Sequence, residues 1–236
     1  GIPDPLWSRG LGDVYKRQML DNIKGLISAH FDNVIKLVVA ISLVCIASSV
    51  SAAPTMGGTV GVSSDYIFRG QSQHIGNHQL SASLDAEWAG MYGSVWVSEV
   101  DFGDGKASHE IDTVVGLKKD WEHIGFNVAY IDYAYRGDES LDYEEILLSA
   151  TIAGVTMSHF MGQDDANDYT EFSTGLLKIV DVAYGDAEGI GTHWAISKGF
   201  DLMKGHVKVG WSEFTADDFS GMVDEDNLFV SYNYHF

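Results

Sequence analysis

Charged residues at alternate positions of apolar–polar segments are the first candidates for function in this chain. In a sheet that closes on itself they would face the interior, where charged side chains must pair or be hydrated. These candidates are Asp65, Arg69, Asp85, Glu87, Glu99, Asp101, Glu110, Asp112 and Lys118. Asp65 and Arg69 are four residues apart on one predicted strand. The spacing predicts an inward ion pair between them, either at a constriction or with a purely structural role.

Acidic loops are the second set of candidates. The carboxylates cluster in segments expected to connect strands, at Asp164, Asp165, Asp168, Asp217, Asp218, Asp224, Glu225 and Asp226. Calcium and magnesium ions prefer several such oxygens, so weak binding of either ion is one interpretation. Attachment to a cation-bridged lipid layer and a merely solvated acidic surface are the others. His74 and His78 lack an evident third ligand, and no metal site is assigned.

The charge balance limits the partners. The chain has 14 Lys and Arg residues against 34 Asp and Glu residues, a net charge of −20. Binding to a nucleic-acid backbone needs basic patches, so no nucleic-acid partner is expected. Cys45 is the single cysteine, which leaves no disulfide framework to predict. Without a phosphate-binding glycine loop or a nucleophile elbow, no enzymatic activity and no cofactor are expected.

A two-residue period organises the chain after residue 58. In the segment 79–88, Leu80, Leu84 and Trp88 share one face, while Asp85 and Glu87 lie on the other. Successive side chains of a strand point to opposite faces, so this pattern indicates strands rather than helices. Twelve strands are predicted, over about 59–69, 78–89, 91–102, 109–120, 124–136, 143–153, 155–163, 169–177, 179–186, 192–200, 205–215 and 226–236.

Short and long connections alternate between these strands. Ala89-Gly90 and Ala153-Gly154 are tight, whereas polar segments such as 70–77 and 216–225 are longer. This asymmetry is typical of periplasmic turns and external loops in a transmembrane β-barrel. The sequence therefore predicts an all-β, closed antiparallel barrel. Tyr66, Phe68 and Phe102 would belong to its external aromatic girdle; a soluble β-sandwich is the alternative.

The last residues form an alternating apolar segment. Tyr232, Tyr234 and Phe236 occupy every second position up to the final residue. They resemble the signal that the barrel-insertion machinery recognises. The last strand is expected to pair with the first, because a bilayer does not tolerate an open sheet edge.

Two N-terminal segments are expected to lie outside the fold. Residues 8–18 resemble a translated sequencing adapter, so residues 1–18 are interpreted as non-native. Residues 19–52 are interpreted as a signal peptide, with an apolar core over 37–46 and cleavage after Ala52; a membrane anchor is the alternative. The barrel would then comprise residues 53–236, exported to a Gram-negative outer membrane.

The segment Val62-Ser-Ser-Asp-Tyr-Ile-Phe-Arg-Gly-Gln-Ser-Gln73 resembles the start of the TorF-type, or Gcw_chp, family of proteobacterial outer-membrane proteins. A looser similarity continues through Leu84–Trp88 and Glu110–Asp112. The resemblance implies an outer-membrane location and a porin role, without a defined solute.

Passive diffusion of small solutes, with a weak preference for cations, is the expected function. A lumen of twelve strands leaves a narrow passage, and acidic loops concentrate cations. Outer-membrane lipid and lipopolysaccharide would surround such a barrel. The alternatives are a non-conducting structural or adhesive barrel and, less favoured, a barrel lipase that uses His159.

Overall fold

The computed structural model describes residues 53–164, 166–177 and 179–236. Within them, twelve strands form one closed antiparallel barrel, in which β1 pairs with both β4 and β14. The predicted fold class is therefore confirmed. The predicted adapter segment, signal peptide and cleavage position lie outside the described residues.

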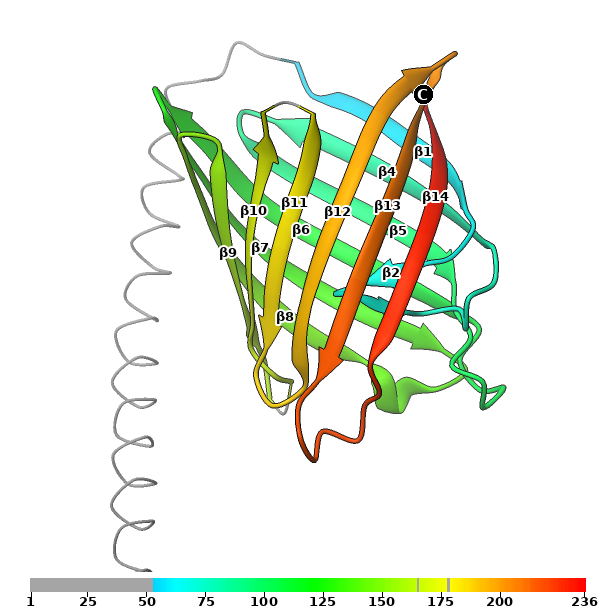
Figure 1. Cartoon of the computed structure of the whole chain (residues 1–236). Coiled ribbons are helices and arrows are strands. Elements are labelled where there is room, and N and C mark those ends of the chain that lie inside the picture. The colour runs from blue at the N-terminus through cyan, green and yellow to red at the C-terminus, as the bar shows by residue number, and fades with distance from the viewer. Residues whose placement is uncertain (1–52, 165, 178) are drawn as a thin grey trace, which may run out of the picture. The chain divides into compact units, whose positions relative to one another are not determined.

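The barrel strands follow one another around the wall in chain order (Figure 1). They are β1 (Thr55–Ser63), β4 (Gln79–Trp88), β5 (Met91–Glu99), β6 (His109–Trp121), β7 (Ile124–Arg136), β8 (Tyr143–Ile152), β9 (Val155–Gly162), β10 (Tyr169–Leu176), β11 (Val180–Ala187), β12 (Gly191–Leu202), β13 (Gly205–Ala216) and β14 (Glu225–His235). Except for the first strand, every predicted strand begins and ends within three residues of these bounds.

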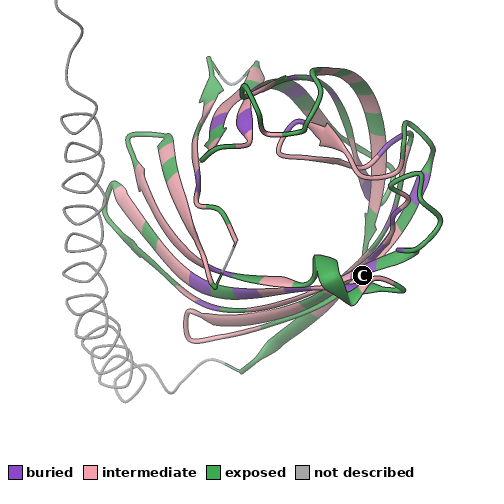
Figure 2. Cartoon of the chain, turned by 90° about the horizontal axis from the view of Figure 1, so that it is seen from below, coloured by how far each residue is buried: buried purple, intermediate pink, exposed green. Residues whose placement is uncertain are grey.

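The alternating apolar and polar residues form the outer and inner surfaces of the barrel. Large apolar side chains project outward and remain exposed, as shown by Leu84 at 66%, Val115 at 62% and Leu228 at 74%. Their neighbours in sequence point into the ring. Bands of different exposure follow one another along parts of several strands (Figure 2), as in the second half of β13. Within the described residues, no helix is long and apolar enough to cross a bilayer.

The two ends of the barrel differ. At one end, here called the short-turn end, two-residue turns such as Ala89-Gly90 and Ala153-Gly154 connect the strands. Both residues of each turn have positive φ, from 52° to 87°, the geometry that suits the twist of a hairpin. At the other end, the loop end, longer segments connect them, including one with a short 3₁₀ helix, η1 (Glu139–Leu141).

The barrel closes at the short-turn end. The amide of Gly58 donates to the carbonyl of Phe236, and the amide of Phe236 donates to the carbonyl of Gly58, both at 3.0 Å. Farther along, Thr59 faces His235 and Ser63 faces Ser231. The predicted pairing of the first and last strands is confirmed.

The first strand is shorter than predicted. β1 ends at Ser63, and the chain then turns into the barrel instead of continuing to residue 69. Residues 64–78, here called the lumen hairpin, contain the two-residue strands β2 (Ile67–Phe68) and β3 (Gln71–Ser72), which pair only with each other. The alternation of residues 64–69 resembles a strand, but its apolar side chains meet the interior of the barrel rather than lipid.

Candidate functional site

The lumen hairpin is the main candidate site because it contacts opposite parts of the wall. On one side, the Arg69 guanidinium bonds to Glu145 of β8 at 2.7 Å, and β8 lies six strands from β14 around the ring. Between these two sides, the Tyr66 ring packs against Trp96 of β5 with centroids 5.2 Å apart. On the other side, Asn227 of β14 donates through Nδ2 to the Gly70 carbonyl at 3.0 Å. The Ser72 amide donates to Glu225 of β14 at 2.8 Å. The segment therefore crosses the interior (Figure 1).

Arg69 forms the most strongly bonded contact of the hairpin. Its Nη1 and Nη2 atoms donate to the two carboxylate oxygens of Glu145 on β8, at 2.8 and 2.7 Å. The Glu145 side chain is only 1% exposed, and it also accepts a hydrogen bond from the Tyr133 hydroxyl at 3.1 Å. A two-pronged, charge-assisted pair of this kind is strong and directional.

Aromatic rings surround the guanidinium of Arg69. Its central carbon lies 4.0 Å from the ring centre of Tyr169, 4.7 Å from that of Phe68 and 4.9 Å from that of Phe160. Rings attract a cation through their negative faces, and they also keep water away from the ion pair. The guanidinium is thus held by β8, β9 and β10 together.

An apolar core lies between the hairpin and the wall formed by β5 to β9. Its buried members include Ala129, Ile131 and Tyr133 of β7, and Tyr66 and Phe68 of the hairpin pack against it. The prediction that Tyr66 and Phe68 join an external girdle is therefore wrong, because both rings lie inside. Part of the lumen is filled with side chains.

The predicted Asp65–Arg69 pair does not form. Asp65 is buried and accepts a hydrogen bond from the Ser72 hydroxyl at 2.9 Å, within the hairpin itself. Arg69 instead reaches Glu145. The prediction assumed one straight strand, whereas the chain bends between the two residues, and Arg69 has a positive φ of 49°.

Gly70 is required by the close approach of the hairpin to β12. It has a φ of +87°, and a Cβ atom there would lie 2.5 Å from Cβ of His193. We expect Gly70→Ala to destabilise the protein by about 1–3 kcal/mol, through backbone strain and this clash. Urea unfolding in lipid vesicles measures the loss. Gly76→Ala is the matched control, because Gly76 also has a positive φ, of 71°, but its Cβ would meet nothing within 4 Å; equal losses for both would contradict the role of packing.

Five of the seven remaining predicted lumen residues point inward. Glu110 and Asp112 lie on the inner face of β6, where Glu110 is fully buried and accepts a hydrogen bond from the Tyr135 hydroxyl at 2.7 Å. The other three, Asp85, Glu87 and Lys118, line a cavity at the short-turn end. The predictions that Glu99 and Asp101 point into the lumen are wrong. Glu99 follows the inward Ser98 and points outward, and Asp101 lies in the loop after β5.

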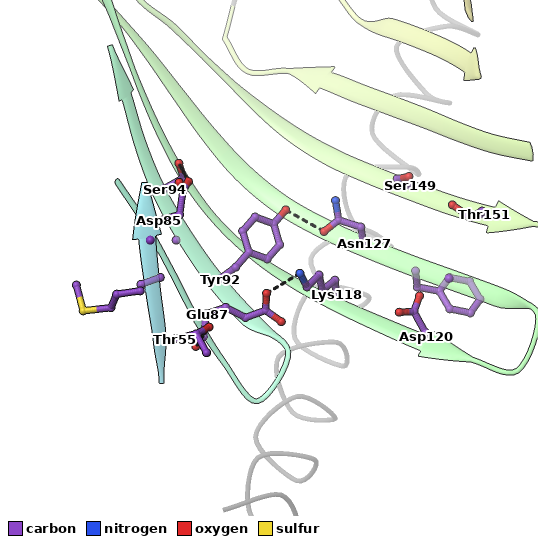
Figure 3. A pocket seen from close by; sticks show the side chains of 16 residues that line it. Thr55, Asp85, Glu87, Tyr92, Ser94, Lys118, Asp120, Asn127, Ser149 and Thr151 are labelled. Atoms are coloured by element: carbon purple, nitrogen blue, oxygen red, sulfur yellow. Dashed lines mark hydrogen bonds and ion pairs between the residues drawn. The ribbon is translucent and has the colours of Figure 1, made fainter. Parts of the chain in front are cut away.

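A cavity of about 650 Å³ lies at the short-turn end (Figure 3). Glu87 and Lys118 form an ion pair of 2.7 Å within it, and the Tyr92 hydroxyl donates to Asn127 at 2.9 Å. Asp85 accepts a hydrogen bond from the Ser94 hydroxyl at 2.6 Å. Tyr92 therefore belongs to the lumen rather than to an interfacial girdle. A volume of this size is suited to a small solute.

A second cavity, of about 940 Å³, lies at the loop end. Phe68, Arg69 and Gln71 of the lumen hairpin line it, together with Tyr143 of β8 and Phe214 of β13. No hairpin residue lines the short-turn cavity. The lumen therefore has a cavity toward each end, with the hairpin contributing to one of them.

Four of the acidic residues predicted in loops accept hydrogen bonds, and two of these four, Glu225 and Asp226, lie at the start of β14 rather than in a loop. Asp168 accepts from the Gly162 amide, Asp224 from the Ala216 amide, and Asp226 from the Trp211 indole, at 2.9 to 3.0 Å. Among the described residues, no three His, Cys, Asp or Glu side chains are placed to hold a metal ion. Asp165 lies outside the described residues, and calcium or magnesium binding stays a prediction.

Two loops at the loop end are joined by an exposed lysine. Lys106 lies 3.3 Å from Asp104 and 3.5 Å from Asp138, across two different loops. The backbone amide of Lys106 lowers the pKa of Asp104, and the hydrogen bond from the Ser140 side chain lowers the pKa of Asp138. Both carboxylates are therefore charged at neutral pH.

Two histidines considered for catalysis or metal binding, His159 and His74, each form a hydrogen bond. His159 points outward from β9 and bonds to the Thr170 hydroxyl at 2.9 Å. His74 uses its Nδ1 on the backbone carbonyl of His78, at 2.9 Å. The Nε2 atom of His159 lies 3.9 Å from Asp168, and the lipase hypothesis stays a prediction.

Comparisons with known proteins agree with the resemblance. Residues 47–151 match the model of a family described as "Bacterial protein of unknown function (Gcw_chp)". This match confirms the predicted family resemblance over that part of the chain, which includes the lumen hairpin. No curated protein sequence matches the chain.

Among solved structures, the chain is similar to the COG4313 outer membrane channel from Pseudomonas putida F1. The identity is 8% over 79% of this chain and 96% of that chain, with a TM-score of 0.29. Such a low score leaves the function to be derived from the geometry of this chain.

Proposed function

We propose that the protein is an outer-membrane channel for passive diffusion of small polar solutes, with a weak preference for cations. The observation that carries the proposal is a closed barrel with an apolar outer surface and, toward each end of its lumen, a cavity lined by charged and polar side chains together with apolar ones. An apolar surface of this extent would cause aggregation in water. It suits the hydrocarbon core of a bilayer, which barrels cross without open edges.

The location follows from the same features. Outer-membrane lipid and lipopolysaccharide would contact the outward apolar side chains, and the barrel-insertion machinery would recognise the final strand. Tyr234 and Phe236 remain exposed there, at 38% and 61%.

Acidic residues dominate the inward positions, which favours cations. The inward acidic residues of the wall are Asp85, Glu87, Glu110, Asp112, Asp120, Glu145, Glu171, Asp181, Asp201 and Glu225, and the inward basic residues are Lys118 and Lys208. The hairpin adds one residue of each sign, Asp65 and Arg69.

We expect planar-bilayer recordings in a potassium chloride gradient to give a reversal potential on the cation-selective side, and this preference should weaken at high salt as charges are screened. Asp85→Asn combined with Glu87→Gln should reduce the preference. Glu213→Gln is the control, because Glu213 is exposed on the outward face of β13. An anion preference, or equal effects of the inward and outward substitutions, would contradict the proposed selectivity.

The filled part of the lumen favours a second candidate, a non-conducting structural or adhesive barrel that presents acidic loops. The apolar core between the hairpin and the wall is the specific observation behind it. Liposome swelling in small sugars separates the two candidates: swelling supports the channel, and its absence in correctly folded protein supports the closed barrel. Catalysis, including the lipase hypothesis, is not proposed.

A further inference from the structure

We infer that the lumen hairpin is the size-determining constriction of this channel, and that the Arg69–Glu145 pair holds the hairpin inside the barrel. The inference rests on the proposed channel function. It assigns a role to the segment Asp65-Tyr-Ile-Phe-Arg-Gly70, which carries the family resemblance.

The contacts of the hairpin place it across the passage. Tyr66 touches β5, Arg69 touches β8, β9 and β10, and Gly70 lies against β12 and β13. β14 bonds to Gly70 and Ser72. A solute moving between the two ends must therefore pass this segment.

The hairpin is attached differently from the wall. Wall strands share continuous ladders of backbone hydrogen bonds, whereas β2 and β3 pair only with each other. The hairpin is held largely by side-chain contacts, with few backbone bonds such as that from the Asp101 amide to the Gln73 carbonyl at 2.9 Å. The hairpin can therefore move out of its position in the lumen without disrupting the barrel, because the hydrogen-bond ladders of the wall strands do not include it.

The Arg69–Glu145 pair is the strongest polar contact between the hairpin and the wall. Removing one partner leaves the other charge buried and uncompensated, which is far more costly than removing both. Release of the hairpin relieves that cost by returning the unpaired group to water. Single substitutions should therefore free the hairpin, while replacement of both residues by apolar ones should keep it seated.

The test measures hairpin release and conductance separately. A reporter Ile67→Cys is placed on β2 in a full chain whose only other cysteine, Cys45, is replaced by Ser. Maleimide labelling is followed in folded protein in lipid vesicles, and single-channel conductance is recorded in planar bilayers. Folding is checked by the heat-dependent shift in gel migration.

We expect Arg69→Gln and Glu145→Gln to raise the labelling rate at least about tenfold and to raise conductance and the solute size limit. Arg69→Met combined with Glu145→Leu should return both readouts toward those of the parent. Glu87→Gln is the matched control, because it breaks an inward ion pair that lies away from the hairpin, and it should leave labelling unchanged.

Three outcomes would overturn the inference in distinguishable ways. Unchanged labelling in the single variants, with current through the parent, would refute the role of the Arg69–Glu145 pair in holding the hairpin, while the channel stands. Increased labelling with unchanged conductance would refute the constriction. Increased labelling without current in any folded variant would refute the channel and with it the constriction, and would leave only the latch.

Discussion

Deleting the lumen hairpin should increase single-channel conductance by about threefold or more, because the narrowest part of a barrel dominates its resistance and a twelve-stranded wall without an insert encloses a wider passage. The variant replaces residues 65–77 with a short Gly-Ser linker between β1 and β4. Its size limit should rise as well, so that larger sugars now cause liposomes to swell.

Shortening a different loop provides the control for this deletion. Removal of residues 217–223 shortens the connection between β13 and β14 but leaves Glu225 and Asn227 in place to bond the hairpin. Conductance of this control should stay near that of the parent. A hairpin-free barrel that folds and conducts no better than the parent would show that the constriction lies elsewhere.

Removing the last five residues should abolish formation of the barrel. Tyr232–Phe236 supply most of the pairing with β1, from Val62 opposite Tyr232 to the paired bonds between Gly58 and Phe236. Without them, backbone groups of β1 have no partner, and each unsatisfied group in hydrocarbon costs several kcal/mol. We expect no heat-shifted band and no protease-protected core after refolding into vesicles.

Replacing the Phe236 side chain distinguishes the contribution of its backbone from that of its aromatic ring. Phe236→Ala keeps the main-chain bonds to Gly58 and should refold into vesicles nearly as well as the parent. Assembly in living cells tests the ring, because the insertion machinery is expected to recognise it. Efficient refolding of the truncated chain would contradict the closure requirement.

The residues that bind the hairpin show how far prediction from the sequence could reach. The sequence predicts that Arg69 and Glu110 point inward, but it does not single out Glu145 and Tyr133, which complete the Arg69 contact. A signal existed: after residue 52 the sequence contains only two arginines, Arg69 and Arg136, and an arginine within an aromatic segment needs an acidic partner. The sequence offers many acidic residues, so the partner could not be chosen without the fold.

The misplacement of Asp65, Tyr66 and Phe68 has a different cause. The alternation of polar and apolar residues indicates which side chains are shielded from water, but it does not distinguish shielding by lipid from shielding by an apolar core. Residues 64–69 therefore read as the end of a membrane strand, although their apolar side chains pack inside the lumen. The prediction for Glu99 is wrong for a related reason, since one residue of register reverses the direction of a side chain, whereas Asp101 lies beyond the end of β5, in a loop.

The sequence by itself determined the barrel, because the two-residue period and the alternating connection lengths are local properties that leave a bilayer protein few other solutions. It also determined the acidic excess of the inward positions, which follows from composition and alternation. Only the tertiary structure decided that the segment after β1 turns inward and that Arg69 meets Glu145, 76 residues away. Such a contact depends on the curvature that brings β8, β9 and β10 around one point, and no local pattern encodes it.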